Sequence, residues 1–79
     1  MNTLDKVNPG NTVQVVRIHG QGSLRRRILS LGLLPGSQMQ VVRVAPLGDP
    51  IEVKFQQTNL IIRGSEAKII EVAQGENHG

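Results

Sequence analysis

Three consecutive arginines, Arg25, Arg26 and Arg27, form the one basic cluster of the sequence. On a helix they span about 200°, so they cannot form a single flat patch. Arg27 falls beside the apolar stripe, where its stem can cover the core. The cluster has two main interpretations: a solvated helix face, or a contact with an acidic surface of a partner protein, for which Arg is favoured. Binding to the backbone of duplex DNA ranks third, because the net charge is low and the helix short.

Three leucines, Leu29, Leu33 and Leu34, form an apolar group just beyond the face of the helix expected to enter the core. Packing under the sheet is the ordinary fate of such residues. A leucine that stays exposed next to Arg25 would instead resemble an interface anchor with a polar rim. The sequence leaves both alternatives open, and this segment is where we expect a partner to bind.

Catalytic chemistry finds no support in the residue pattern. The chain has no cysteine, its six carboxylates are scattered, and no serine lies in a nucleophile-elbow motif. We therefore find no pair of nucleophile and base, and no arrangement for general acid and base catalysis. The sequence predicts a protein that is not an enzyme and has no catalytic residues.

Metal and cofactor sites are not predicted either. His19 ends a strand and His78 lies near the C-terminus, and neither has a second ligand at helical or hairpin spacing. Gly20 and Gly22 begin like a dinucleotide-binding fingerprint, but Arg25 stands at its third position and no βαβ unit surrounds it. We interpret the two glycines as a turn from strand into helix.

Length and composition predict one small domain of residues 1–73, followed by a disordered polar tail of residues 74–79. The net charge of +3 permits nucleic acid or an acidic protein as partner. Phe55 is the only aromatic residue, so a stacking platform for single-stranded nucleic acid is missing. The N-terminus does not resemble a signal peptide, and no window approaches about 20 apolar residues. We expect a cytoplasmic protein without membrane insertion.

Five short segments have the β-branched, alternating pattern of strands and are separated by Gly and Pro turns. The sequence also predicts one helical turn at residues 64–67. These elements predict an all-β fold with one short helix, in the form of a small, partly open antiparallel barrel, because closure removes exposed strand edges. The expected strands are Thr12–Ile18, Gln38–Ala45, Ile51–Phe55, Leu60–Arg63 and Ile69–Ala73.

The one good helical stretch is Leu24–Leu31. At about 100° per residue, Leu24, Ile28 and Leu31 share a face that we expect in the core. Ser23 can cap the start of this helix, and Gly32 is placed to end it in the left-handed conformation.

The segment Leu24–Gly36 combines an Arg-rich helix with Leu-Gly at 31–32 and Leu-Pro-Gly at 34–36, and Val-Ala-Pro-Leu-Gly-Asp-Pro follows at 44–50. Leu-Ile-Ile-Arg at 60–63, a Ser-Glu-Ala turn and a closing Ile-Ile-Glu-Val come next. This order strongly resembles the ferrous iron transport protein A family over residues 4–73. The resemblance implies an SH3-like barrel, a module also found at the C-terminus of iron-dependent repressors of the diphtheria-toxin-repressor type.

The resemblance further implies a non-enzymatic accessory protein that binds and regulates the cytoplasmic GTP-binding part of the ferrous iron permease. A homo-oligomer stays open, and nucleic acid is not an expected partner. Two alternative functions remain: a small basic nucleic-acid-binding barrel, and a metal-ion sensor whose ligands are shared across an oligomer. The partner-binding residues carried over from matching motifs are Arg25, Arg26, Leu29, Leu33, Leu34, Leu47 and Asp49.

Overall fold

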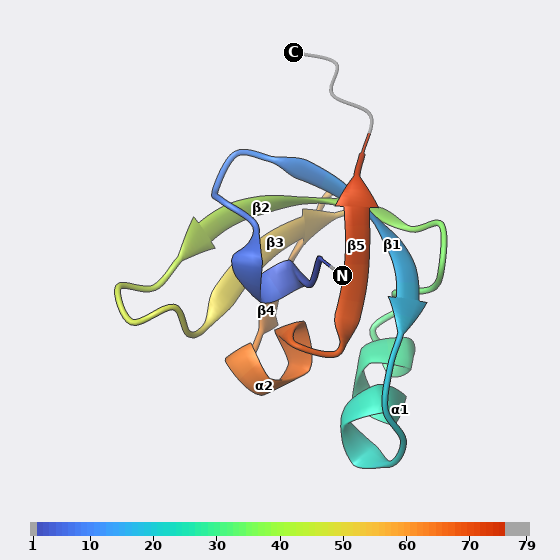
Figure 1. The fold of residues 1–79 in the computed structure, drawn as a ribbon. Coiled ribbons are helices and arrows are strands. Elements are labelled where there is room, and N and C mark those ends of the chain that lie inside the picture. The colour runs from blue at the N-terminus through green and yellow to red at the C-terminus, as the bar shows by residue number, and fades with distance from the viewer. Residues whose placement is uncertain (1, 76–79) are drawn as a thin grey trace.

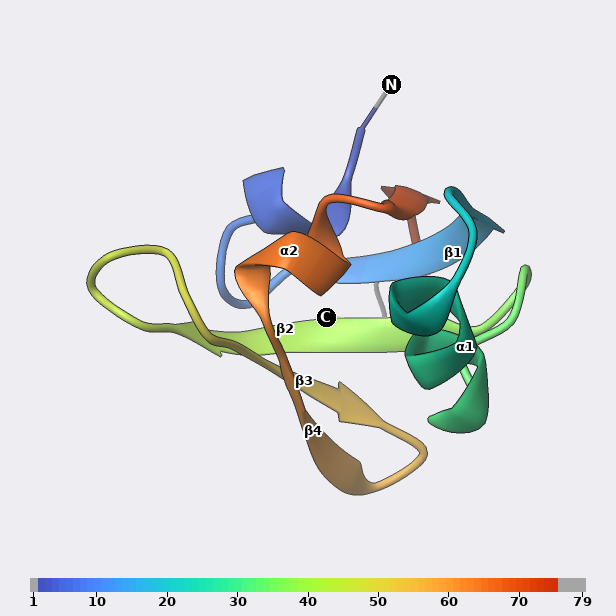
Figure 2. The ribbon, with the colours of Figure 1, turned by 90° about the horizontal axis from the view of Figure 1, so that it is seen from below.

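The computed structural model describes residues 2–75 as one five-stranded antiparallel sheet in the order β4-β3-β2-β1-β5, so β4 and β5 are its edges. The sheet is strongly bent, and two short helices lie at one end of it (Figures 1 and 2). This confirms the expected mostly-β, five-stranded fold. The elements are η1 (Leu4–Lys6), β1 (Thr12–Ile18), α1 (Ser23–Ser30), β2 (Gln38–Val44), β3 (Ile51–Phe55), β4 (Thr58–Ile62), α2 (Gly64–Ala67) and β5 (Ile70–Gln74).

The core lies on the inner face of the bent sheet, where alternate strand residues are buried. Val13 and Val15 of β1 point inward, as their alternation predicts. The pairing of β1 with β5 is irregular between Val15 and Arg17, because β1 has one extra residue there, Val16. Val16 is therefore exposed, and Ile18 points into the core again. The bulge explains why Val16 and Ile18 break the alternation of the sequence.

The N-terminal segment, which was expected within the domain of residues 1–73, makes contacts that the sequence pattern did not predict. Leu4 in the 3-10 helix η1 is completely buried. Thr3 pairs with Glu71 in an isolated antiparallel bridge, and the N–H of Val72 donates to the carbonyl of Asn2 (2.9 Å). The segment therefore runs along part of the free edge of β5.

Helix α1 begins at Ser23, with Gly22 as its N-cap and no side-chain capping bond, so the expectation that Ser23 caps this helix is wrong. Of the expected core face, only Ile28 is fully buried. Leu31 is half-buried and Leu24 is 39% exposed, because Leu24 lies in the first turn at the outer end of the helix. The described helices are all too short and too polar to cross a bilayer.

Gly32 ends α1 with a φ of 92°, as predicted. A Cβ built there would lie 3.6 Å from the Phe55 ring, an ordinary contact, so only the backbone conformation disfavours a side chain. We expect Gly32→Ala to lower the free energy of unfolding by about 1 kcal/mol in urea denaturation. Gly32→Asn should cost less, since Asn tolerates the left-handed region. Equal losses for both variants would contradict this explanation.

Two strand boundaries differ from the sequence-based expectation. Strand β4 begins at Thr58 because Gln56 and Gln57, both with positive φ, form a two-residue hairpin turn after β3. Strand β5 ends at Gln74, so placing this residue in a disordered tail is wrong. The rest of the expected tail, residues 76–79, lies outside the described residues. The predicted helical turn at residues 64–67 is confirmed as α2.

Candidate functional site

The segment of residues 25–34 presents two arginines and an apolar anchor to solvent. Arg25 and Arg26 on α1 are exposed, Leu29 is half-buried against the core, and Leu34 is 53% exposed. We call Arg25, Arg26, Leu29 and Leu34 the α1 surface. An exposed leucine that follows a pair of arginines combines apolar contact area with donors for carboxylates.

The backbone around Leu34 is fixed by hydrogen bonds. The N–H of Leu34 donates to Oγ of Ser37 (3.0 Å), and the N–H of Ser37 donates back to the carbonyl of Leu34 (2.9 Å). The next turn is tied to β1, since the N–H of Gly36 donates to the carbonyl of Val15 (2.8 Å). Leu34 therefore protrudes from a rigid turn, and little backbone entropy would be lost when a partner covers it.

Leu33 is the one residue of the predicted partner-binding set that the fold removes from the surface. Its side chain is 0% exposed and belongs to the core cluster. Leu33 cannot contact a partner in this conformation, and including it in the set was wrong. The reason is geometric: the turn after Gly32 directs one of the two adjacent leucines inward and the other outward.

Arg27 is partly exposed to solvent and also contacts α2. Its Nε donates to Oε2 of Glu66 at 2.7 Å. The Glu66 side chain is 1% exposed, and its Oε1 accepts the backbone N–H of Arg63 at 2.8 Å. Both carboxylate oxygens are thus satisfied, and the pair joins α1 to α2. The sequence prediction missed this pair, because a Glu at the third position of α2 indicates only the capping bond with the N–H of Arg63.

Leu47 and Asp49 lie in the loop between β2 and β3, on the opposite side of the molecule from α1, and α2 lies between the two (Figures 1 and 2). Leu47 is 96% exposed. The loop is held by bonds from the N–H of Gly48 to the carbonyl of Ala45 (2.7 Å) and from the N–H of Ala45 to the carbonyl of Pro50 (3.0 Å). The predicted set therefore forms two separate surfaces.

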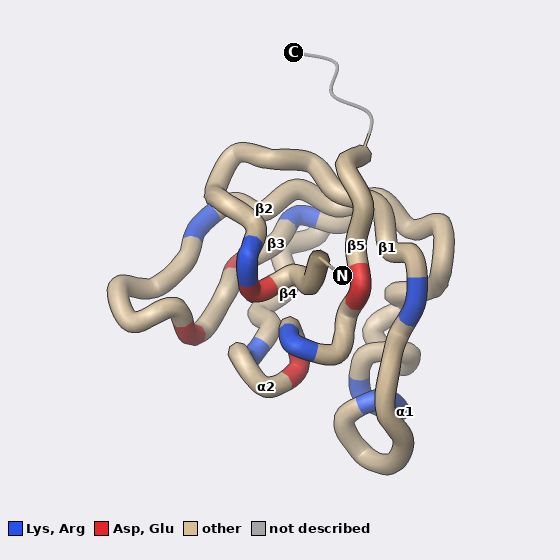
Figure 3. The backbone as a smooth tube through the Cα atoms, viewed as in Figure 1, with Lys and Arg blue, Asp and Glu red and all other residues tan. Residues whose placement is uncertain are grey.

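Leu47 and Asp49, which we call the loop surface, border an open hollow of about 770 Å³ beside α2. Its lining includes Asp49 and Lys68, so it carries both signs of charge, and Leu47 stands at its edge. Within residues 2–75, Lys and Arg are otherwise spread over the N-terminal segment, β1, α1, β2, β3 and the two ends of α2 (Figure 3). This distribution lacks the single basic stripe typical of proteins that follow a nucleic-acid backbone.

The histidine that directly follows β1 is paired with a carboxylate. Nε2 of His19 lies 2.7 Å from Oε1 of Glu71 on the neighbouring strand β5. Within residues 2–75, no group of three or more His, Cys, Asp or Glu side chains could hold a metal ion. His78 falls outside the described residues.

A family model described as the FeoA domain matches residues 2–74. The chain is 36% identical over 69 residues to the "Fe(2+) transport protein A/Fe(2+) transporter FeoB fusion protein" of Porphyromonas gingivalis. That match covers 87% of this chain and only 8% of the fusion protein.

Solved structures with the same fold include a FeoA-like protein from Clostridium acetobutylicum, with a TM-score of 0.86 and 32% identity over 98% of this chain and 90% of that one. A second is Stenotrophomonas maltophilia FeoA, described as an SH3 domain protein and complexed with zinc, with a TM-score of 0.80 and 27% identity over 92% and 91% of the two chains. The regulator IdeR of T. acidophilum shares the fold at 20% identity, with a TM-score of 0.84 over 94% of this chain and 34% of that one. The expected SH3-like fold and its recurrence in iron-dependent regulators are confirmed.

Proposed function

Because this chain belongs to the FeoA domain family, we propose that it is a non-enzymatic accessory protein of bacterial ferrous iron uptake. It regulates the ferrous iron permease by binding the permease's cytoplasmic GTP-binding part, which places it in the cytoplasm. The single observation that carries this proposal is the relative from P. gingivalis, whose name joins an Fe(2+) transport protein A and an Fe(2+) transporter in one chain. Two modules that are fused in one organism commonly act on each other in another.

The chemistry of the α1 surface supports a protein partner. Arg25 and Arg26 offer forked donors that match carboxylates, and the rigidly held Leu34 offers an apolar anchor. Arg27 takes no direct part, since its Nε is engaged by Glu66. We therefore assign partner binding to the α1 surface, with Leu47 and Asp49 as a second contact from the opposite side of α2.

Binding to the purified cytoplasmic domain of the permease from the same organism, measured by calorimetry, tests this proposal. We expect Arg26→Glu and Leu34→Asp each to weaken binding at least tenfold, because the first reverses a charge and the second removes the anchor. The matched controls are Arg43→Glu and Ile61→Asp, which alter exposed residues of β2 and β4. Leu34 and Ile61 are equally exposed, at 53% each. Comparing the two variants therefore separates the effect of a residue's position on binding from the effect of losing an exposed hydrophobic side chain.

Two results would contradict the proposal. In the first, the intact protein fails to bind the permease domain in the presence or absence of GTP. In the second, all four variants lose affinity equally, which would place the contact elsewhere. Duplex DNA and single-stranded RNA should be titrated at low salt in parallel, since steeply salt-dependent binding to either would favour the nucleic-acid alternative.

A further inference from the structure

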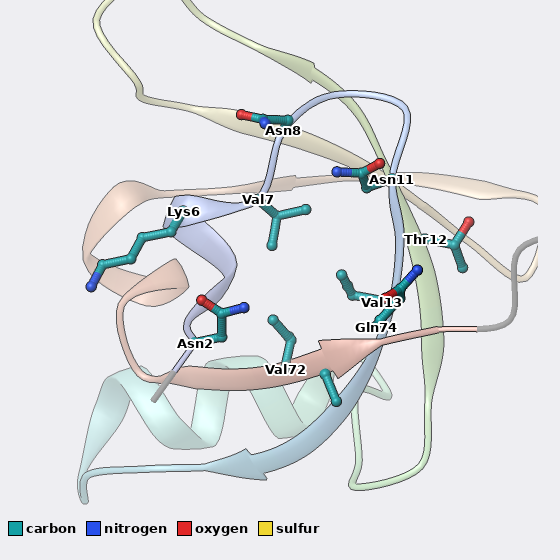
Figure 4. A pocket seen from close by; sticks show the side chains of 10 residues that line it. Asn2, Lys6, Val7, Asn8, Asn11, Thr12, Val13, Val72 and Gln74 are labelled. Atoms are coloured by element: carbon teal, nitrogen blue, oxygen red, sulfur yellow. The ribbon is translucent and has the colours of Figure 1, made fainter.

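A bowl of about 310 Å³ lies at the free edge of β5, away from the α1 surface. β5 forms one side of the bowl and the start of β1 forms the second (Figure 4). The N-terminal segment and the loop that follows it enclose the rest. Its volume falls at the lower end of the range for ligand sites. No acidic residue is among the ten that line it, which are Asn2, Lys6, Val7, Asn8, Asn11, Thr12, Val13, Val72, Ala73 and Gln74.

The edge of β5 offers unpaired backbone groups to this bowl. The N–H of Gly75 donates to the carbonyl of Thr12 on β1 (2.9 Å). In an antiparallel ladder the neighbouring residue directs its groups the other way, so the N–H and carbonyl of Gln74 point toward the free edge. The N–H of Val72 also points toward the free edge, where it donates to the backbone carbonyl of Asn2. Among residues 2–75, no segment continues this pairing as far as Gln74.

The walls of the bowl suit the main chain of a peptide. In Figure 4, Val7, Val13 and Val72 form an apolar floor, and the amides of Asn2, Asn11 and Gln74 surround it. Side-chain amides both donate and accept, as a peptide backbone does. The volume of about 310 Å³ is large enough for a small branched side chain, and alternate residues of an added strand would face this side.

The two ends of the bowl differ in charge. Asn2 and Lys6 stand together at one end, beyond Val72, whereas Gln74 marks the other (Figure 4). A strand that added antiparallel to β5 would run from Gln74 toward Asn2, so its C-terminus would arrive beside Lys6. The Lys6 side chain extends outward from that end and is exposed, which leaves it free to turn onto a carboxylate.

We propose that this bowl binds the free C-terminus of an extended peptide from a partner protein. The peptide pairs antiparallel with β5 at Gln74, places a valine or isoleucine side chain on the valine floor, and directs its terminal carboxylate to Lys6 and Asn2. This site is independent of the α1 surface and of the permease proposal.

The test uses a pooled library of synthetic hexapeptides that end in valine or isoleucine, prepared both as free acids and as C-terminal amides. Peptides retained by the immobilised protein are identified by mass spectrometry and then titrated into ¹⁵N-labelled protein. We expect the free acids to be retained at least tenfold over the amides, with amide shifts at Asn2, Lys6 and Gln74. N-methylation of the main-chain groups that face β5 should weaken binding at least tenfold, because it removes the strand pairing.

Two pairs of variants locate the site. Gln74→Pro removes the N–H that faces the free edge without touching a bond to β1, and should abolish retention, whereas Gln74→Thr should preserve it. Lys6→Gln should reduce retention of free acids at least fivefold, and Lys54→Gln on β3 should leave it unchanged. Unfolding curves show that each variant is folded before it is compared.

Three outcomes would overturn the proposal. The first is equal retention of acids and amides, or no retention of either. The second is a set of peptide-induced shifts at the α1 surface instead of the β5 edge. The third is a concentration-dependent shift at Gln74 without peptide, which would make a second copy of this chain the occupant of the edge.

Discussion

Truncating Ile28 to alanine is expected to lower the free energy of unfolding by about 3 kcal/mol, which for a domain of this size shifts Tm down by roughly 15 °C. Ile28 is 0% exposed and is the only residue of α1 that is fully buried. A helix of eight residues is not stable by itself in water, so α1 depends on this contact with the sheet. The loss combines the transfer free energy of the removed methyl groups with the cavity that remains.

Two further variants on the same element control this prediction. Ile28→Val should cost about 1 kcal/mol, since it removes a single methylene. Leu24→Ala should cost less than about 1 kcal/mol, because Leu24 is already 39% exposed. Urea denaturation followed by circular dichroism measures all three. A loss for Leu24→Ala as large as that for Ile28→Ala would show that α1 is held by a broader face than the structure indicates.

Replacing Arg27 by methionine is expected to cost about 2 kcal/mol, because it leaves the buried Glu66 carboxylate without its counter-ion. The full penalty for breaking a buried ion pair is larger. The Arg27 side chain is 53% exposed, however, so water can reach the gap and reduce the loss. Methionine keeps most of the aliphatic stem, and the measured loss therefore reports on charge more than on packing.

A double-mutant cycle with Glu66→Gln separates charge from shape. The amide oxygen of glutamine can still accept the N–H of Arg63, which the carboxylate accepts at 2.8 Å, and the buried group becomes neutral. Arg27→Met should then cost less than about 1 kcal/mol in the Glu66→Gln background. If Arg27→Met lowers the free energy of unfolding equally in both backgrounds, Arg27 stabilises the fold only through the packing of its aliphatic stem. Binding of the permease domain measured on the same variants shows whether the orientation of α1 against α2 matters to the partner.

The local sequence pattern was sufficient to predict most of the helices and strands. It failed where tertiary contacts determine the position of a residue. Gly32 and the turn at residues 64–67 were predictable because the left-handed glycine and the one-turn helix are local features. Leu4 was not, because it occupies the core only after the N-terminal segment has folded over β5. The pair of Arg27 and Glu66 joins residues far apart in the sequence, so no spacing rule could find it.

At the candidate site, local sequence pattern is even less able to predict where a side chain points. Leu33 and Leu34 are adjacent and identical in type, yet one is 0% and the other 53% exposed. Their directions depend on how the turn after α1 is tied to β1, which sequence does not encode locally. Leu47 and Arg26 were grouped by a family resemblance, and only the fold separates them onto opposite sides of α2. The resemblance itself supplied the SH3-like fold, which patterning alone had described as a small five-stranded barrel.

The position of β1 between β2 and β5 has a consequence for how the chain folds during synthesis. β1 lies near the start of the chain and β5 near its end, and the pairing of His19 with Glu71 joins residues 52 positions apart. Until β5 has left the ribosome, one edge of β1 has no partner, and the inner face of the sheet lacks Ile70 and Val72. Contacts between distant residues slow folding because the loop must close before any of them forms. We therefore expect this domain to fold after translation of β5 and not in stages, with nascent chains that end before Ile70 sensitive to protease.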